Sequence, residues 1–197
     1  PVIIYTLEAF QRHPNIDKIE VVCLDGWQEI LRAYCKQFGI TKLANVVEGG
    51  ENGQSSIRNG LWDLKEMYDE NDLVLIHDAI RPMVSEEIIS DAIRVCKKYG
   101  NSISVIPCAE AMLKTEDGVS SLEQIPRDNL KRTQTPQTFV LKDIVAAHEE
   151  ALEKGITNSV ASCTLYIELG KKLYFSAGSE KNIKLTTPDD IDIFKSL

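Results

Sequence analysis

Apolar and polar positions along the chain follow two periods, one typical of helices and one typical of strands. Apolar residues three and four apart predict helices, whereas short β-branched runs such as KIEVVCL predict strands. Most of the helical segments end at a glycine or before a proline. The expected helices cover residues 2–13, 27–38, 55–68, 85–99, 141–154, 159–169 and 188 onward. The expected strands cover residues 18–24, 44–47, 72–76, 101–107 and 172–176.

This alternation predicts an α/β fold in which a mainly parallel sheet carries helices on both faces. In such folds a nucleotide or another small ligand binds at the carboxyl ends of the strands. The alternation breaks at residues 108–133, a polar and turn-rich stretch that predicts an extended excursion such as a β-arm. The sequence contains no internal repeat and no second core, so we expect a single domain over residues 1–197.

The charge balance limits the class of partner. The chain has 22 Lys plus Arg against 30 Asp plus Glu, a net charge of −8. A nucleic-acid partner is not expected, because binding its phosphates needs clustered cations. No membrane is expected either, since no apolar run reaches the roughly 20 residues of a membrane helix. The five cysteines form no close pair and no signal peptide is visible, which favours the cytoplasm. Because the net charge is negative, any anion must be bound by cationic side chains or backbone amides gathered at one site.

The first segment with candidate chemistry is a glycine-rich turn, EGGENGQSSIRNGL, over residues 48–61. Its glycines let backbone amides approach a ligand closely, and Ser55 or Ser56 adds a hydroxyl beside the positive end of a helix dipole. The spacing matches neither a Walker loop nor a dinucleotide fingerprint. Taken alone, the pattern favours a tight turn with a capping serine.

The second segment, HDAIRP, follows an apolar strand directly. Asp78 could hold a hard cation such as Mg²⁺, and Arg81 could bind a phosphate with two hydrogen bonds. The alternative is an Asp–Arg ion pair that closes a loop. The position at the end of a strand favours the functional interpretation. His77 is more typical of a loop or core histidine than of a base.

Two further segments are less distinctive. IPRD at residues 125–128 and TQTPQTF at residues 133–139 place hydroxyl and amide side chains near Arg127, which suits a polyhydroxy phosphate but is also common in polar turns. In NIKLTT, at residues 182–187, Lys184 could reach a phosphate or remain a solvated surface lysine.

Taken together with the opening PVIIYTL, these segments resemble the 2-C-methyl-D-erythritol 4-phosphate cytidylyltransferases and the related ribitol-5-phosphate cytidylyltransferases, over essentially the whole chain. The resemblance implies a Rossmann-like nucleotidyltransferase fold that forms a homodimer through the arm. It implies transfer of CMP from CTP to a polyol phosphate, with Mg²⁺ and release of pyrophosphate. The acceptor stays open between 2-C-methyl-D-erythritol 4-phosphate, D-ribitol 5-phosphate and another polyol phosphate. The pathway stays open between isoprenoid and cell-wall or capsule biosynthesis.

The roles of individual residues come from this resemblance. The residues that would contact the cytidine are Gly50, Glu51, Ser56 and Ala79. Those that would hold the polyol phosphate are Arg127, Thr135 and Lys184. Asp78 would bind the metal, and Arg81 and Lys184 would act in catalysis. Because two polyanions must meet, the reaction needs alignment and charge neutralisation and no protein nucleophile.

Three positions depart from the usual pattern of the family. Ala111 stands where a threonine is common, Asn158 where an aspartate is common, and Gly53 where an arginine is common. These changes favour keeping a rival hypothesis, a non-catalytic nucleotide-binding or interaction module that retains the fold. In the resembled family a strand and a glycine-rich loop precede the position of Pro1. We therefore expect both to be missing before residue 1, and this fragment alone to be inactive.

Overall fold

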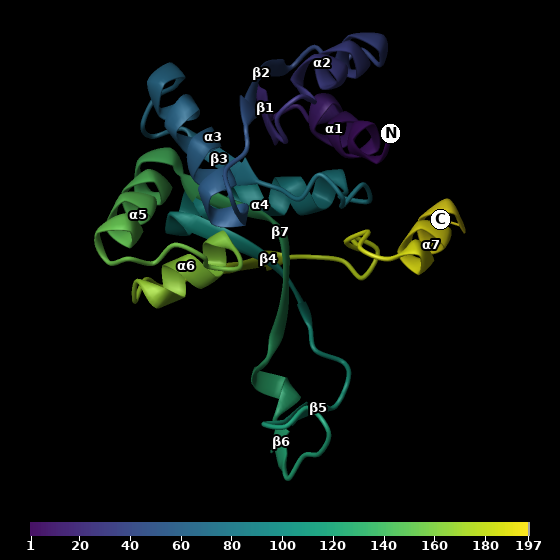
Figure 1. The fold of residues 1–197 in the computed structure, drawn as a ribbon, viewed down its shortest axis with the longest axis vertical. Coiled ribbons are helices and arrows are strands. Elements are labelled where there is room, and N and C mark those ends of the chain that lie inside the picture. Colours follow the sequence, from purple (N-terminus) through teal and green to yellow (C-terminus); the bar gives the residue numbers. More distant parts are fainter. Residues whose placement is uncertain (197) are drawn as a thin grey trace.

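Helices and strands alternate along the first hundred residues, as the hydrophobic periodicity predicts. The computed structural model describes residues 1–196 (Figure 1). Its helices are α1 (Val2–Arg12), α2 (Gln28–Gln37), α3 (Gly53–Met67), α4 (Glu86–Tyr99), α5 (Leu141–Glu153), α6 (Ser162–Glu168) and α7 (Pro188–Ser196). Its strands are β1 (Ile19–Cys23), β2 (Leu43–Glu48), β3 (Leu73–Ile76), β4 (Asn101–Pro107), β5 (Met112–Lys114), β6 (Glu123–Ile125), β7 (Lys131–Val140) and β8 (Phe175–Ala177).

The part of the structure outside the arm is called the body, and its strands form two sheets. β1 and β2 pair in parallel, and a larger sheet has the order β3-β7-β4-β8. β4 and β8 are parallel, whereas β7 runs antiparallel to both β3 and β4. The predicted α/β class is therefore confirmed, with β7 as an antiparallel strand inside the larger sheet.

β7 is the body strand that the sequence pattern did not predict. Its sequence, KRTQTPQTFV, is polar, and such a composition is typical of a loop. In the structure the strand is hydrogen-bonded to a neighbour on each side, and its Gln137 side chain is buried. The side-chain Oε1 of Gln137 accepts a hydrogen bond from the Cys163 backbone N–H at 2.9 Å. Polar side chains are tolerated in this central strand because their amides find partners inside the body.

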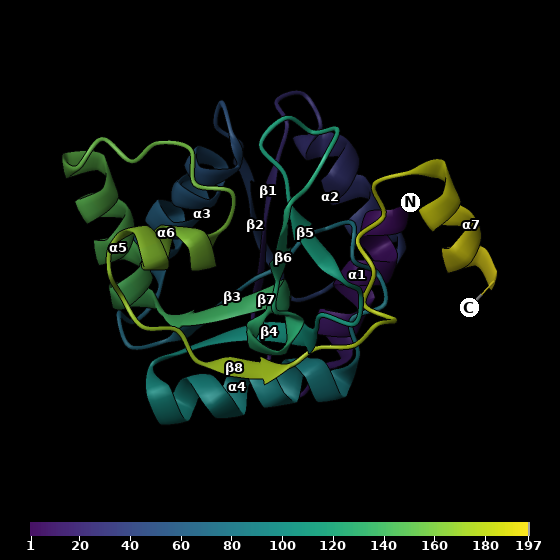
Figure 2. The ribbon, with the colours of Figure 1, turned by 90° about the horizontal axis from the view of Figure 1, so that it is seen from below.

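Helices cover both faces of the larger sheet (Figure 2). α4 lies against one face, and its buried stripe of Ile88, Ile89 and Ile93 packs with apolar residues of α1, β1 and α2. On the other face a second cluster joins α3, α5 and α6 to Ile103 and Phe139 of the sheet. The core is thus divided between the two faces, and the ends of the strands are left for a site. No helix within residues 1–196 combines the length and the apolar character needed to cross a membrane.

The predicted and observed ends of the helices agree best where the helix has strong capping residues. Ser85 caps α4 by accepting a hydrogen bond from the backbone of its first turn, and Gly100, with φ 88°, ends the helix. α3 begins at Gly53 rather than Ser55, because Asn52 is the N-cap. α6 begins at Ser162 instead of residue 159, and β8 begins at Phe175 instead of residue 172.

The predicted excursion is present as an arm between β4 and β7. β5 and β6 form an antiparallel pair at its tip, followed by one 3₁₀ turn (Arg127–Asn129). Figure 1 shows the arm extending away from the body. The last residues of the predicted stretch, 131–133, belong to β7. The arm exposes apolar side chains: Val119 is 91% exposed and Leu122 is 107% exposed.

Candidate active site

The loop that follows β3 lies at the carboxyl end of that strand, where α/β folds bind ligands. The loop turns back at once, because the Arg81 backbone N–H donates to the Asp78 carbonyl at 3.0 Å. α1 holds the next residue, since the Thr6 hydroxyl donates to the Ala79 carbonyl at 2.7 Å. The HDAIRP segment is therefore a fixed turn that presents its charged side chains at the end of the sheet.

The Asp78 carboxylate forms ion pairs with two cationic side chains. Its Oδ2 lies 3.0 Å from Arg81 Nε, and its Oδ1 lies 3.3 Å from Lys184 Nζ. The Arg81 side chain is only 12% exposed, and its Nη1 donates to the Asn182 carbonyl at 2.7 Å. The Lys184 side chain is 44% exposed. Arg81 is therefore held at two points, whereas Lys184 is exposed enough to leave the Asp78 carboxylate and pair with an incoming anion.

Thr135, on β7, ties this loop to the sheet. Its hydroxyl accepts a hydrogen bond from the Asp78 backbone N–H at 3.1 Å and lies 3.0 Å from His77 Nδ1. On the other side of the ring, His77 Nε2 lies 3.2 Å from the Arg81 carbonyl. Burial lowers the pKa of His77 to about 4, so the ring is neutral near pH 7.

Two amide side chains outside the predicted set hold the C-terminal segment over the loop. Asn182 is fully buried, and its Nδ2 donates to the Thr135 carbonyl at 2.9 Å and to Gln134 Oε1 at 3.3 Å. These bonds bring Lys184 to Asp78. A sequence signal existed, because Gln134 lies in TQTPQTF and Asn182 lies two residues before Lys184.

The glycine-rich turn is organised by its own hydroxyl groups. The Gly50 backbone N–H donates to Ser56 Oγ at 3.0 Å, and Ser55 forms a capping box with Asn52. A Cβ atom at Gly50 would clash with the Ser55 side chain, so this position requires glycine. Glu51 is exposed. Ser56 is therefore engaged in shaping the turn.

Within residues 1–196 no hydrogen bond or ion pair joins this turn to residues 77–82, called the Asp78 loop below. The turn is linked instead to the segment before α6. Gln54 Nε2 donates to the Ile156 carbonyl at 2.7 Å, and the Ser159 backbone N–H donates to Gln54 Oε1 at 2.7 Å. Arg127 is also separate, because it is exposed on the arm and donates to the Ala109 carbonyl. The structure thus brings together the predicted residues Asp78, Ala79, Arg81, Thr135 and Lys184.

The donor set around Asp78 suits a magnesium ion carried by a phosphate ligand. Mg²⁺ usually binds through one or two carboxylates plus substrate phosphate oxygens. Asp78 supplies one carboxylate beside two cationic side chains, Arg81 and Lys184. Among the described residues, no group of three or more His, Cys, Asp or Glu side chains could hold a metal by itself. The fit is therefore to a shared site, with oxygens from both the protein and the ligand.

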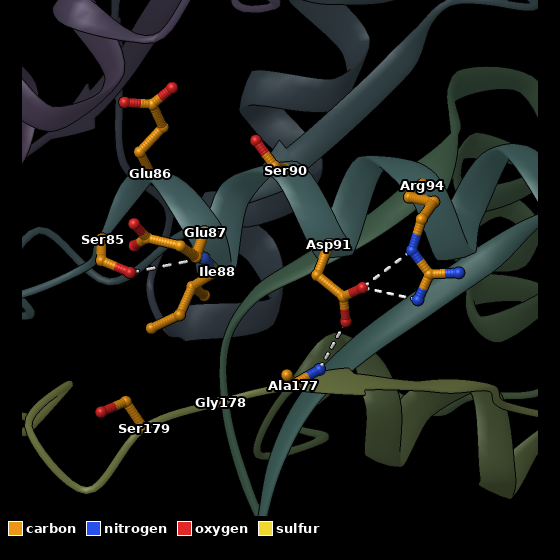
Figure 3. Close-up of a pocket in the computed structure, with 10 residues that line it drawn as sticks. All are labelled: Ser85, Glu86, Glu87, Ile88, Ser90, Asp91, Arg94, Ala177, Gly178 and Ser179. Atoms are coloured by element: carbon orange, nitrogen blue, oxygen red, sulfur yellow. Dashed lines mark hydrogen bonds and ion pairs between the residues drawn. The ribbon is translucent and has the colours of Figure 1, made fainter.

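A groove of about 620 Å³ lies elsewhere, between the start of α4 and the chain after β8 (Figure 3). Glu86, Glu87 and Asp91 line it, and Arg94 is already paired with Asp91 at 2.6 Å. Asp91 Oδ2 also accepts a hydrogen bond from the Ala177 backbone N–H at 2.8 Å. With these carboxylates and no free guanidinium, the groove disfavours a phosphate ligand. It contains none of the predicted site residues.

Comparison with known proteins decides the family. The sequence model described as IspD, 2-C-methyl-D-erythritol 4-phosphate cytidylyltransferase, matches residues 1–196. The chain belongs to the IspD family. A ribitol-5-phosphate cytidylyltransferase of Lacticaseibacillus paracasei is 42% identical over 198 residues, which cover 100% of this chain and 85% of that protein. A 2-C-methyl-D-erythritol 4-phosphate cytidylyltransferase of Clostridium acetobutylicum is 38% identical over 198 residues, which cover 97% of this chain and 82% of that protein.

Solved structures agree with this assignment. The crystal structure of 4-diphosphocytidyl-2C-methyl-D-erythritol synthase from Anaerococcus prevotii matches with a TM-score of 0.87 at 26% identity, covering 99% of this chain and 84% of that one. The resemblance and the nucleotidyltransferase fold predicted from the sequence are therefore confirmed. The roles of the individual residues within the IspD family site stay predictions.

The three departures from the IspD pattern lie on the surface. Ala111 is exposed on the arm, and Asn158 is exposed before α6. Gly53 is the first residue of α3, and a Cβ atom built there has no neighbour within 4 Å. A side chain at Gly53 would therefore fit without rearrangement.

Proposed function

We propose that this protein transfers the cytidylyl group of CTP to the phosphate of a polyol phosphate and releases pyrophosphate. The observation that carries the proposal is the convergence of Arg81 and Lys184 on Asp78, at the carboxyl end of β3. Membership of the IspD family and the names of the relatives support it.

The reaction is a substitution at phosphorus. An oxygen of the polyol phosphate forms a bond to the α-phosphorus of CTP, and the bond from that phosphorus to the bridging oxygen of pyrophosphate breaks. Pyrophosphate leaves with the electron pair. Since both reactants are anions, Arg81 and Lys184 lower the barrier by neutralising charge where it accumulates. Asp78 would hold Mg²⁺, which would supply further neutralisation of the triphosphate.

The remaining predicted residues would bind the two substrates. Gly50, Glu51, Ser56 and Ala79 would contact the cytidine. Thr135, whose hydroxyl lies beside Asp78, would contact the polyol phosphate together with Lys184. Arg127 would complete this second site from the arm.

A homodimer would account for the position of Arg127. In a single chain Arg127 lies on the arm and makes no ion pair within residues 1–196, while Leu113, Val119 and Leu122 are exposed nearby. A second copy would cover this apolar tip and receive Arg127 beside its own Asp78. The five cysteines are free, which fits a reducing compartment, so the cytoplasm is the proposed location.

D-Ribitol 5-phosphate is the first acceptor to test, because relatives at 42% and 40% identity carry that name. The assay measures pyrophosphate released by the full-length protein from CTP and Mg²⁺, with D-ribitol 5-phosphate, 2-C-methyl-D-erythritol 4-phosphate and other polyol phosphates. We expect release with at least one acceptor, and none with EDTA or without an acceptor. Binding of CTP without release from any acceptor would instead support a non-catalytic nucleotide-binding module.

A further inference from the structure

His77 has no assigned task in the transfer, although it lies within the loop that carries Asp78 and Arg81. Its ring packs against Phe10 of α1, with 5.0 Å between the ring centroids. Each of its two nitrogens faces a polar atom of the site: Thr135 Oγ1 at 3.0 Å and the Arg81 carbonyl at 3.2 Å. A histidine that served only to fill space would not need both contacts.

The chemistry of these partners fixes the direction of each hydrogen bond. The Arg81 carbonyl can only accept, so Nε2 of His77 carries the proton. Nδ1 is then the acceptor of the ring, and the Thr135 hydroxyl, 3.0 Å away, donates a hydrogen bond to it. The same hydroxyl oxygen accepts from the Asp78 backbone N–H at 3.1 Å. The result is one continuous chain of hydrogen bonds, from the Asp78 backbone through Thr135 and His77 to the Arg81 backbone.

We propose that His77 is a positioning residue that sets Asp78, Arg81 and Thr135 in one geometry. The ring fixes the orientation of the Thr135 hydroxyl, and through it the backbone that carries Asp78. At its other nitrogen the ring fixes the carbonyl of Arg81. This inference rests on the proposed function, since it assigns His77 to the same site.

The loop would keep its overall course without the ring. The Asp78–Arg81 ion pair, the bond from Arg81 to the Asn182 carbonyl and the contact of Thr6 with Ala79 do not involve His77. Loss of the ring would free the Thr135 hydroxyl to rotate and the Asp78 backbone to shift. Small misplacements of this kind act on turnover more than on ground-state binding.

His148 provides a matched control. It is a buried histidine, 1% exposed, but neither of its nitrogens has a hydrogen-bond partner among residues 1–196, and its ring packs near Trp62. Replacing either histidine by Phe removes an imidazole and roughly keeps the volume. Only the replacement at residue 77 also breaks a hydrogen-bond chain in the site.

The first test is spectroscopic and does not depend on activity. Two-bond ¹H–¹⁵N NMR of the full-length protein at pH 7.5 distinguishes the imidazole tautomers. We expect a single Nε2–H tautomer for His77, which disappears as a signal in His77→Phe. An Nδ1–H tautomer, or rapid averaging between the two, would overturn the proposed hydrogen-bond chain.

The second test is kinetic. We expect His77→Phe to lower kcat by about 10- to 100-fold, with the KM for CTP changed by less than about threefold. His77→Asn, which keeps an acceptor for Thr135, and His77→Gln, which keeps a donor for Arg81, should lie between His77→Phe and the wild type. His148→Phe should keep the wild-type kcat.

The outcomes separate the two proposals. A wild-type protein that releases no pyrophosphate from any acceptor overturns the proposed function and, with it, the role of His77. An active wild type whose His77→Phe variant keeps its kcat overturns the role of His77 alone. If His77→Phe does not fold, wild-type turnover in both His77→Asn and His77→Gln has the same meaning.

Discussion

The Asp78 loop and the arm are built in opposite ways, although both carry residues predicted to act in the same transfer. The loop is held by contacts from distant parts of the chain: Thr135 lies 57 positions from Asp78, and Asn182 lies 101 positions from Arg81. The hydrogen bonds at the arm's tip are local. Thr115, Asp117 and Ser120, for example, bond one another within five residues.

This difference separates two kinds of order. The loop is preorganised by the body, so its charged groups need little rearrangement when a ligand binds. The arm has a defined local fold, but its apolar tip has no partner surface among residues 1–196. In the proposed function the loop would supply alignment for turnover, whereas the contribution of Arg127 would depend on where the arm docks.

The largest expected effects are at Asp78 and at Lys184, which pairs with it from the C-terminal segment. Asp78→Asn and Lys184→Ala should each lower kcat by about 100-fold or more, because the first weakens the proposed Mg²⁺ ligand and the second removes a cation proposed to neutralise the reacting phosphates. Circular dichroism should be unchanged. Lys181→Ala is the control, since this exposed lysine of the same segment makes no ion pair among the described residues. Near-normal turnover in both site variants would refute their assigned roles.

A smaller effect is expected in the arm. Arg127→Ala should raise the KM for the polyol phosphate about tenfold, roughly 1.4 kcal/mol, and leave the KM for CTP unchanged. Steady-state kinetics with each substrate varied in turn measures both values. Arg132→Ala removes a nearby guanidinium that is paired with Glu180 at the surface and should alter neither KM. An equal rise in both KM values would show that the arm does not act on the acceptor alone.

The body should also respond to acid through His148. Burial lowers the pKa of His148 to about 4, from an ordinary value of 6.5. The unfolded chain therefore binds this proton more tightly, and stability falls as the pH drops below about 6.5 towards 4. Between pH 7.5 and 5.5 this histidine should cost roughly 1.3 kcal/mol of unfolding free energy. Urea titrations should show a smaller loss in His148→Phe than in the wild type, and equal losses would contradict the assignment.

The smallest expected effects are on stability. They come from removing one helix cap in the body and one turn-forming side chain in the arm. Ser85→Ala removes the N-cap of α4 and should lower the unfolding free energy by about 1 kcal/mol. Asp117→Ala removes the acceptor that organises the arm's tip and should increase proteolysis there without moving the urea midpoint. An equal shift of the midpoint in both variants would mean that arm and body unfold as one unit.

The sequence predicted what local chemistry determines. The limits of α4 follow from Ser85 and Gly100, and the strand over residues 101–107 is correct at both ends. β7 was missed because its side chains are polar, and only the neighbouring strands and the buried amide partners of Gln137 explain it.

The site was predictable to the same degree. Asp78 and Arg81 lie three positions apart; the sequence predicted a metal ligand and a phosphate-binding residue, and the ion pair that the structure contains was the alternative. The segment of Asn182 was marked by the nearby Lys184, but the bonds of Asn182 to Gln134 and Thr135 were not predictable, because they cross 48 and 47 positions. The wide separation of Arg127 from Asp78 within one chain also has no local signal, since it depends on the direction in which the arm leaves the sheet.

The bond from Asp91 to Ala177 has a consequence for solubility. β8 is the outer strand of the larger sheet, and such an edge offers unpaired backbone groups to any other extended chain. The Ala177 N–H already donates to the Asp91 carboxylate, and Glu86 and Glu87 line the same groove. A strand that approached this edge would meet negative charge and find that donor occupied. The acidic groove beside α4 therefore disfavours pairing of a further strand at this edge of the sheet.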